Sequence, residues 1–276
     1  MRKITLGTDT EGFLYHVKSQ QHVPATSFNT PETSEKRGSL GVYGTFHRDN
    51  ILIEYQTFPA PISKFPSMVR NARVTLSNIL WRRGFRAFYS PIIEYKDPRM
   101  VACPEALEMG CNPDLCAYTG EKFHGPTTWT DLGLSRVAGG HIHIGGIEDY
   151  SEEQKRNLVK LLDIFFAQKE QSTLVSWNTE LRRREFYGQW GRWRDKPYGL
   201  EYRSPGPWWP AGSLSQTAQI GTGVQICVNA NDAQLNADDF RDQAELPTIH
   251  NLVTHNLHWG SKWAEVRKAC IAKTTT

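Results

Sequence analysis

Three short segments of the chain carry pairs of ionisable residues that stand two positions apart and are flanked by glycine. The pairs are Asp9 and Glu11, His141 and His143, and Glu201 and Arg203. Side chains alternate between the two faces of a β-strand, so each pair would project from one face. Such a face is costly to bury unless it holds a cation or an anionic substrate. Carboxylates and imidazoles suit Mg²⁺ or Mn²⁺, and arginine suits phosphate, so the pairs indicate an enzyme that handles a nucleotide.

Each pair also has a plainer interpretation. Asp9 and Glu11 could face solvent, as acidic pairs near an N-terminus often do. His141 and His143 could be core histidines that are bonded to carbonyl groups. The histidines stand between isoleucines and next to glycines, however, which gives a strand with one imidazole face that a ligand can approach closely. This spacing recurs among metal ligands in unrelated folds, so we expect at least one of the two histidines to bind metal.

Two further carboxylates are candidates for the same site. Glu54 lies in an alternating segment, 48–57, that we predict to be a strand. It is either a metal ligand beside the first acidic pair or a solvated residue at a sheet edge. Asp114 follows Asn112 and Pro113 in a predicted turn, and it is either a further metal ligand, a substrate contact or only a turn residue.

The segment 182–203 is the richest in cations, which alternate with aromatic residues. Its basic residues are Arg182, Arg183, Arg184, Arg192, Arg194, Lys196 and Arg203. Such a mixture suits either a surface that stacks single-stranded nucleic acid or an arginine-lined phosphate pocket. Three glycines, at 188, 191 and 199, favour the pocket, because they allow a tight path around a ligand. We expect Arg192, Arg194 and Arg203, with His143, to bind the nucleotide, and Arg184 and Tyr187 to contact the substrate.

Composition limits the class of protein. The chain has 276 residues, a formal net charge of +3, 39% hydrophobic and 22% charged residues, which is ordinary for a globular protein and too weakly basic to imply nucleic acid. No apolar run approaches the ~20 residues of a membrane span, and the N-terminus shows no signal peptide, so cytoplasm is the expected location. Five cysteines without CxxC spacing indicate free thiols, although Cys111 and Cys116 could be metal ligands.

The predicted elements form one α+β domain over residues 1–276, with a strand-rich sheet backed by a few helices. Strands are expected at 3–15, 48–57 and 85–91, and a loop over the site at 17–40. Helices are expected at 63–83, capped by Ser63, at 151–177, capped by Ser151 and Gln154, and at 245–259. The segment 213–228 is ambiguous.

Together these motifs resemble the glutamine synthetase and glutamate–cysteine ligase superfamily, and above all its small phage-associated branch, the type 2 COOH–NH2 ligases, or amidoligases. Asp9–Phe13 is similar to the early acidic strand of glutamine synthetases, although Asp9 stands where they have Glu. His141 matches the metal ligand of their glycine-flanked His-x-His strand, and Glu201 with Arg203 matches their Glu-x-Arg strand. The segments 48–54 and 110–119 resemble motifs of the amidoligase branch.

The resemblance implies a curved, mainly antiparallel sheet whose concave face holds ATP and Mg²⁺ or Mn²⁺, with helices packed outside. It implies metal ligands at Asp9, Glu11, Glu54, His141 and Glu201, and catalytic roles for Arg192, Glu201 and Arg203. The reaction would join a carboxylate to an amine through an acyl phosphate. A homo-oligomer and, for a phage-encoded enzyme, the host cytoplasm would fit the same family.

Two other classes of function use the same residues. A metal-dependent hydrolase could activate water with the histidines and carboxylates, without ATP. A nucleic-acid-binding protein could use the segment 182–203, and its binding would depend steeply on salt.

Overall fold

One large antiparallel sheet organises the chain, and its central strand is the first one. The structure is a computed structural model, and it describes residues 2–28, 36–106, 114–123, 133–171, 177–240 and 256–274. The sheet has twelve strands, whose main path runs in the order β10-β9-β13-β14-β12-β1-β5-β4-β3, while β2, β6 and β7 also pair with β1. The predicted α+β class with a mainly antiparallel sheet is confirmed.

The strands of the sheet are mostly short, apart from β1. They are β1 Thr5–His16, β2 Gln21–Val23, β3 Gly38–Ser39, β4 Gly44–Asp49, β5 Leu52–Thr57, β6 Ala60–Pro61, β7 Phe85–Phe88, β9 Asp114–Cys116, β10 Lys122–Phe123, β12 Gly140–Gly145, β13 Arg192–Lys196 and β14 Gly199–Tyr202. A second, two-stranded sheet pairs β8 (Ile92–Glu94) with β11 (Ser135–Val137).

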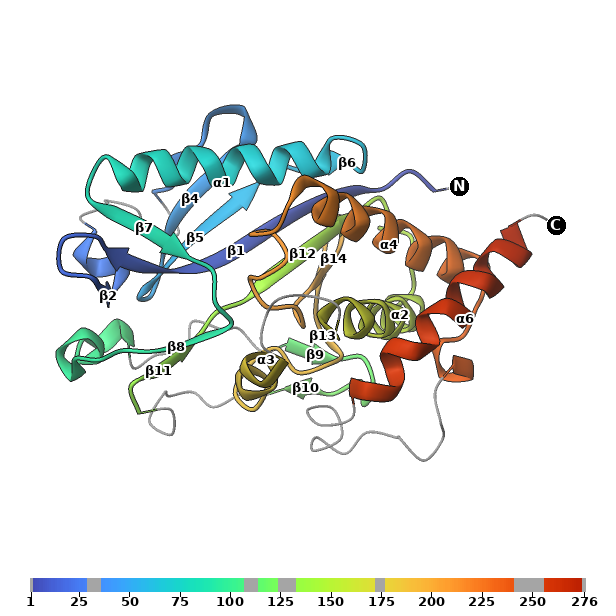
Figure 1. The fold of residues 1–276 in the computed structure, drawn as a ribbon. Helices are drawn as coiled ribbons and strands as arrows, with labels where there is room; N and C mark the ends of the chain where they lie inside the picture. Colours follow the sequence, from blue (N-terminus) through green and yellow to red (C-terminus); the bar gives the residue numbers. More distant parts are fainter. Residues whose placement is uncertain are drawn as a thin grey trace.

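Five α-helices lie in the described part of the chain. They are α1 Phe65–Trp81, α2 Glu152–Gln171, α3 Trp177–Arg184, α4 Leu214–Asp232 and α6 Asn256–Thr274. Figure 1 shows α1 and α4 lying along the same side of the sheet, with α2 and α6 beside α4. No helix in this part of the chain is both long and apolar enough to cross a membrane.

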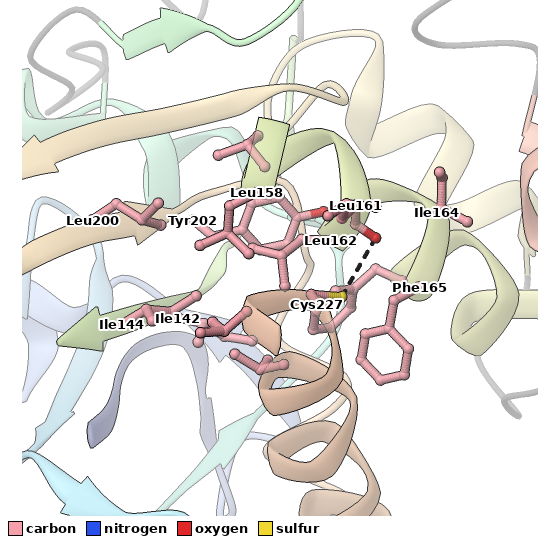
Figure 2. Packing of buried hydrophobic residues seen from close by; sticks show 14 of the residues in the cluster. Ile142, Ile144, Leu158, Leu161, Leu162, Ile164, Phe165, Leu200, Tyr202 and Cys227 are labelled. Atoms are coloured by element: carbon pink, nitrogen blue, oxygen red, sulfur yellow. Dashed lines mark hydrogen bonds between the residues drawn. The ribbon is translucent and has the colours of Figure 1, made fainter. Parts of the chain in front are cut away.

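The main core lies between the sheet and helices α2, α4 and α6. Ile142 and Ile144 of β12 and Leu200 of β14 are fully buried on this side, against Leu162 and Phe165 of α2. Figure 2 shows these side chains packed together around Cys227, whose thiol donates to the carbonyl oxygen of Leu161 at 3.6 Å. Because strand side chains alternate, this apolar side leaves the intervening polar residues of β12 and β14 on the opposite face.

Several predicted elements are confirmed, and their caps explain where they begin. The strands at 3–15 and 85–91 are observed as β1 and β7. Helix α2 begins after Ser151, which exchanges hydrogen bonds with Gln154 as predicted. The ambiguous segment 213–228 is helix α4, because Ser213 and Gln216 form the same kind of capping box. The helix predicted at 63–83 is observed as α1, but Lys64 is its N-cap and Ser63 does not cap it.

Other predictions need correction. The segment 48–57 is a tight hairpin of β4 and β5 and not a single strand, because Asn50 takes a left-handed conformation with φ of 51°. Asparagine tolerates this conformation better than most residues, so the chain can reverse there.

The expected loop at 17–40 contains the short strands β2 and β3, and 29–35 lie outside the described residues. The helix predicted to span 151–177 ends at Gln171 in α2, and residues 172–176 lie outside the described part. Most of the helix predicted at 245–259 also lies outside it, and α6 begins at Asn256.

The buried layer between α2 and the sheet gives a first prediction. Replacing fully buried Leu162 by alanine should lower the free energy of unfolding by about 2–5 kcal/mol, because the substitution removes packed methyl groups and leaves a cavity. Thermal unfolding of the purified protein measures this loss. Ile271→Ala is the matched control, since the Ile271 side chain in α6 is 54% exposed and its loss should cost less than about 0.5 kcal/mol. Equal effects of the two substitutions would contradict the described core.

Candidate active site

The register of the central strands brings the three ionisable pairs together on one face of the sheet. Strand β1 lies between β12 and β5, and it places Asp9 opposite His141 and Glu11 opposite Glu54. Strand β14 lies on the other side of β12 and places Glu201 opposite His143. Segments that are far apart in the sequence therefore form one buried polar cluster, on the side of the sheet away from the main core.

Asp9, His141 and Glu201 form the first of two groups that could hold a metal ion. Each offers one ligand atom, and these atoms lie within 4.8 Å of one another. His141 Nδ1 is 3.0 Å from Asp9 Oδ1 and 3.5 Å from Glu201 Oε1. All three side chains are buried. The second histidine is adjacent, with His143 Nε2 at 3.1 Å from Asp9 Oδ2.

Glu11, Asp49 and Glu54 form the second group, next to the first on the same face. Their ligand atoms also lie within 4.8 Å of one another. One oxygen of Glu11 accepts a hydrogen bond from the backbone N–H of Gly139 at 2.6 Å, which ties this group to the start of β12. Glu54 accepts a hydrogen bond from the Gln56 amide at 2.8 Å.

The electrostatics of the two groups differ. Burial alone would raise the pKa of Asp9, but the imidazoles of His143 and His141 hold it well below its ordinary value. Burial and Asp9 would likewise raise the pKa of Glu201, but Arg203 and His141 lower it to about 2. In the second group burial raises the pKa of Glu54 well above its ordinary value, with a further increase from neighbouring acids such as Asp9 and Asp49.

The pKa of Asp49 is raised, like that of Glu54. Burial and then the charge of Glu11 raise its pKa to about 7. The first group is therefore already partly balanced by cationic neighbours, whereas the second group has an excess of negative charge. A divalent cation would supply the charge that the second group lacks.

The donor set fits hard divalent cations. Five of the six groups are carboxylates and the sixth is an imidazole, which is the ligand chemistry of Mg²⁺ and Mn²⁺. Asp9 is buried, and the nearest cationic group to its Oδ1 is the His141 imidazole at 3.0 Å. Buried carboxylates are costly unless cations or donors offset their charge, so the space shared by the ligand atoms of Asp9, His141 and Glu201 marks a position for a cation.

Strands β13 and β14 place a row of cations beside the first group. Arg192, Arg194 and Lys196 alternate along β13, so they project from one side of it. Lys196 Nζ lies 2.7 Å from Glu201 Oε2, and Arg194 Nη1 lies 3.9 Å from Glu201 Oε1. Arg192 is buried and donates to Gln189 Oε1 at 3.0 Å, and burial lowers its pKa to about 10.

Arg203 is held by several protein groups at once. Its guanidinium contacts Glu201 through Nη1, Asp114 Oδ1 through Nε at 3.0 Å, and the Tyr187 hydroxyl through Nη2 at 2.5 Å. Asp114 also accepts a hydrogen bond from Arg194 Nε at 3.0 Å. Asp114 and Tyr187, which we expected to contact substrate, therefore lie in the site as partners of its arginines.

Arg184, the third expected substrate contact, lies elsewhere. Its side chain is fully buried, with the guanidinium carbon 3.5 Å from the centre of the Trp190 ring and one nitrogen 3.3 Å from Glu180 Oε1. These contacts join α3 to the loop before β13, and we do not propose a substrate contact for Arg184.

A pocket of about 330 Å³ opens beside the second histidine. Its walls come from β1, β5, β12 and the loop between β13 and β14, and its lining residues are Thr5, Gly7, Thr8, Gln56, Thr57, Pro59, His143, Gly145, Glu148 and Tyr198. The Tyr198 hydroxyl contacts His143 Nδ1. His143 therefore lines the pocket and also contacts Asp9 of the first group.

Sequence reasoning missed three residues of this site. Asp49 lies in the hairpin that was predicted to be one strand, and the alternation of His47 and Asp49 before the turn-forming Asn50 is the signal that would have revealed it. Lys196 was only one basic residue among many. Tyr198 was grouped with the aromatic residues, and nothing in its neighbourhood connects it with His143, which is 55 positions away.

Comparisons with known proteins agree with the motifs. Residues 135–246 match the family described as Phage phiEco32-like COOH.NH2 ligase-type 2, so the predicted resemblance is confirmed over that segment. No curated protein matches in sequence. The match supports a carboxylate–amine ligase, and it includes His141, His143, Glu201 and Arg203.

Two solved structures align with most of this chain. One is described as a novel glutamine synthase homolog, with 11% identity and a TM-score of 0.41 over 97% of this chain and 65% of that chain. The other is GmaS without ligand, with 12% identity and a TM-score of 0.41 over 99% of this chain and 69% of that one. The chain thus spans about two thirds of the length of each.

The excess charge of the second group gives a pH prediction. The raised pKa values of Asp49, about 7, and of Glu54 mean that the folded, metal-free protein binds more protons than the unfolded chain, whose carboxyls titrate near pH 4. The protons held by Asp49 and Glu54 stabilise the folded state, and this contribution is fully present below pH 4. It is lost as pH rises towards 7, by about 1.4 kcal/mol of unfolding free energy per pH unit for each proton held. Thermal unfolding in a chelator should show a falling midpoint from pH 5 to 7. Added Mn²⁺ should stabilise the protein more at pH 7 than at pH 5.

Asp49→Asn is the control for this pH dependence. The amide keeps the shape of the side chain but cannot ionise, so the variant should lose much of the decline in stability. A metal-free wild-type protein whose stability rises from pH 5 to 7 would contradict the charge distribution of the second group.

Proposed function

We propose that this chain, like the ligase family that residues 135–246 match, joins a carboxylate to an amine, with ATP as the source of energy. The observation that carries the proposal is the single sheet face that combines two acidic metal-ligand groups with a row of cations. A site that transfers phosphoryl groups needs both, because metals and basic side chains offset the charge of the phosphates. We propose one catalytic domain over residues 1–276, working in the cytoplasm, or in that of the host if a phage encodes it.

The two acidic groups would hold the metal ions. Asp9, His141 and Glu201 would hold one ion, and Glu11 and Glu54, with Asp49, would hold another. Bound Mg²⁺ or Mn²⁺ would offset the charge of the β- and γ-phosphate oxygens. His47 lies at the edge of the second group, with Nε2 3.7 Å from Glu54 Oε1.

The cations of β13 and β14 face the position of the transferred group. Arg194 and Lys196 are the more exposed of them, at 20% and 29% of their side chains, and they would reach phosphate oxygens most directly. Arg192 and Arg203 are buried and would contribute positive charge from inside the protein. The substrate carboxylate would attack the γ-phosphorus to give an acyl phosphate and ADP. The amine would then attack the acyl carbon and displace phosphate, which leaves the amide.

The pocket beside His143 is the proposed position of the nucleoside part of ATP. Its volume is at the lower end of the range for small-molecule sites, and its walls mix threonine hydroxyls with apolar surface. His143 stands between the pocket and Asp9, where it would contact phosphate. The pKa of His143 is raised: burial alone would lower it, but the Asp9 carboxylate outweighs that effect and favours the protonated form.

Burial argues against a nucleic-acid surface in the segment 182–203. Arg183 and Arg184 are fully buried, and Trp190 and Trp193 are 1% exposed. Bases stack on exposed aromatic rings, so these residues do not provide such a platform. A hydrolase that uses the same metal groups differs from a ligase in consuming no ATP, and the turnover assay described next separates the two.

The first test is ATP turnover with Mg²⁺ or Mn²⁺ in the presence of pooled carboxylates and amines. Phosphate release that requires both a carboxylate and an amine would support the ligase. Glu201→Gln should lower this rate at least ~100-fold, because it removes a charged ligand from the first group and the charged partner of Arg203 Nη1. Glu265→Gln, on helix α6 with its side chain 58% exposed, serves for comparison and should keep most of the rate. Full ligase activity in Glu201→Gln would overturn the assignment of the site.

The nucleotide pocket gives a separate prediction through Gly7. A Cβ at this position would lie 3.5 Å or more from its neighbours, so Gly7→Ala should bind nucleotide almost as the wild type does. A larger side chain would project into the pocket, and Gly7→Val should weaken ATP binding by at least ~10-fold in titration calorimetry. Unchanged ATP affinity in Gly7→Val would place the nucleotide elsewhere.

A further inference from the structure

We infer that Tyr187 is a positioning residue, which aims the metal-binding edge of His141 at the carboxylates of the first group, and that it does not contact substrate. The inference rests on the metal site of the proposed function but not on the ligase reaction. Tyr187 lies on the loop that follows α3, outside the three motifs, and 46 positions from His141.

The Tyr187 hydroxyl lies between a histidine and an arginine. It is 2.8 Å from His141 Nε2 and 2.5 Å from Arg203 Nη2. Arginine can only donate, so the phenol oxygen accepts from Arg203. The same oxygen meets the ring nitrogen of His141 that points away from the carboxylates.

The geometry of imidazole makes this contact decisive for His141. Its two nitrogens lie on opposite edges of one rigid ring, so a partner that fixes Nε2 also fixes the direction of Nδ1. Nδ1 lies 3.0 Å from Asp9 Oδ1 and 3.5 Å from Glu201 Oε1, in the first acidic group. Metal-binding histidines commonly use their second nitrogen in this way, and loss of such a partner typically weakens metal binding ~10–100-fold.

Packing holds Tyr187 and His141 in this arrangement. The two rings meet edge to face with their centres 5.9 Å apart, and Tyr187 is only 7% exposed. A Cβ on Gly139 would overlap His141 Nε2, so the glycine before the histidines makes room for the ring.

The loop that carries Tyr187 is itself anchored. The N–H of Tyr187 donates to the Arg183 carbonyl at 2.8 Å, and the Arg183 side chain is buried against Glu180. Gly188 has φ of 71°, and a Cβ there would overlap the Arg183 guanidinium. The Tyr187 hydroxyl is thus positioned by a hydrogen-bonded, packed turn and not by an exposed loop that substrate could reach.

The same hydroxyl links His141, a member of the first group, to Arg203. The guanidinium of Arg203 contacts Glu201 through Nη1, and Nη1 lies 3.4 Å from His141 Nδ1. Tyr187 therefore contacts Nε2 of His141 and Nη2 of Arg203, while Nδ1 of His141 and Nη1 of Arg203 both lie near Glu201. Removing one hydroxyl should loosen both.

The test is Mn²⁺ binding to Tyr187→Phe, followed by electron paramagnetic resonance without nucleotide or substrate. Phenylalanine keeps the ring and removes only the hydroxyl. The expected result is a loss of ~10–100-fold in affinity for one Mn²⁺ ion, with the second ion bound as in the wild type.

Tyr202→Phe is the matched control. Its hydroxyl is also fully buried and donates to Asp163 at 2.7 Å, but it lies on the core side of the sheet, next to Glu201 in sequence. This variant should lose thermal stability and keep its Mn²⁺ affinity. A loss of affinity in both variants to the same extent would mean general loosening of the fold and would overturn the inference.

A second measurement needs no variant, and it decides the matter should Tyr187→Phe fail to fold. Wild-type protein with ¹⁵N-labelled histidine and bound ¹¹³Cd²⁺ should show metal coupling to Nδ1 of His141, with Nε2 hydrogen-bonded. Coupling to Nε2 would mean that the metal displaces Tyr187, and it would overturn the inference.

The outcomes separate this inference from the proposed function. Wild-type protein that binds no divalent cation would overturn both. Normal Mn²⁺ affinity in Tyr187→Phe, with a raised KM for a substrate, would overturn only the positioning role and return Tyr187 to the substrate site.

Discussion

The structure depends on one constraint, which is that the central strand of the sheet buries carboxylates. Strand β1 carries Asp9 and Glu11 on one face, while Leu6 on its other face packs into the main core. Buried carboxylates must be neutralised or protonated, because their hydration is lost. The strands on either side of β1 surround these carboxylates with different charges, and this difference divides the residues of the face into two groups.

On the β12 side, positive charge is built into the protein. His141, His143, Arg203 and Lys196 surround Asp9 and Glu201, and the pKa values of both acids are low despite their burial. On the β5 side the neighbours are further acids, and the pKa values of Glu54 and Asp49 are high. The proposed phosphoryl-transfer function would gain from such asymmetry. Cations fixed in the protein are in place before the substrate arrives, while a strongly acidic group is completed only by metal.

The arginines show how a binding site and a scaffold can use the same residue type. Arg183 and Arg184 are fully buried and hold α3 and the following loop through Glu180 and Trp190. That loop delivers Tyr187 to His141. Arg194 and Lys196, on the neighbouring strand, remain partly exposed beside Glu201. The dense basic segment therefore combines fully buried structural arginines with partly exposed cations beside the candidate metal groups, and burial distinguishes the two kinds.

The sequence by itself determined which residues could do chemistry. Period-two spacing placed Asp9 with Glu11 and His141 with His143 on common faces, and glycine-flanked histidines indicated close approach, because these are local properties of an extended chain. The tertiary structure decided the rest. Strand order and register placed Asp9 opposite His141 and brought Asp49 beside Glu11, through a hairpin that the sequence pattern concealed. The contact of Tyr187 with His141 and the burial of Arg184 also appeared only in the fold, since they depend on how distant segments pack and not on any local spacing.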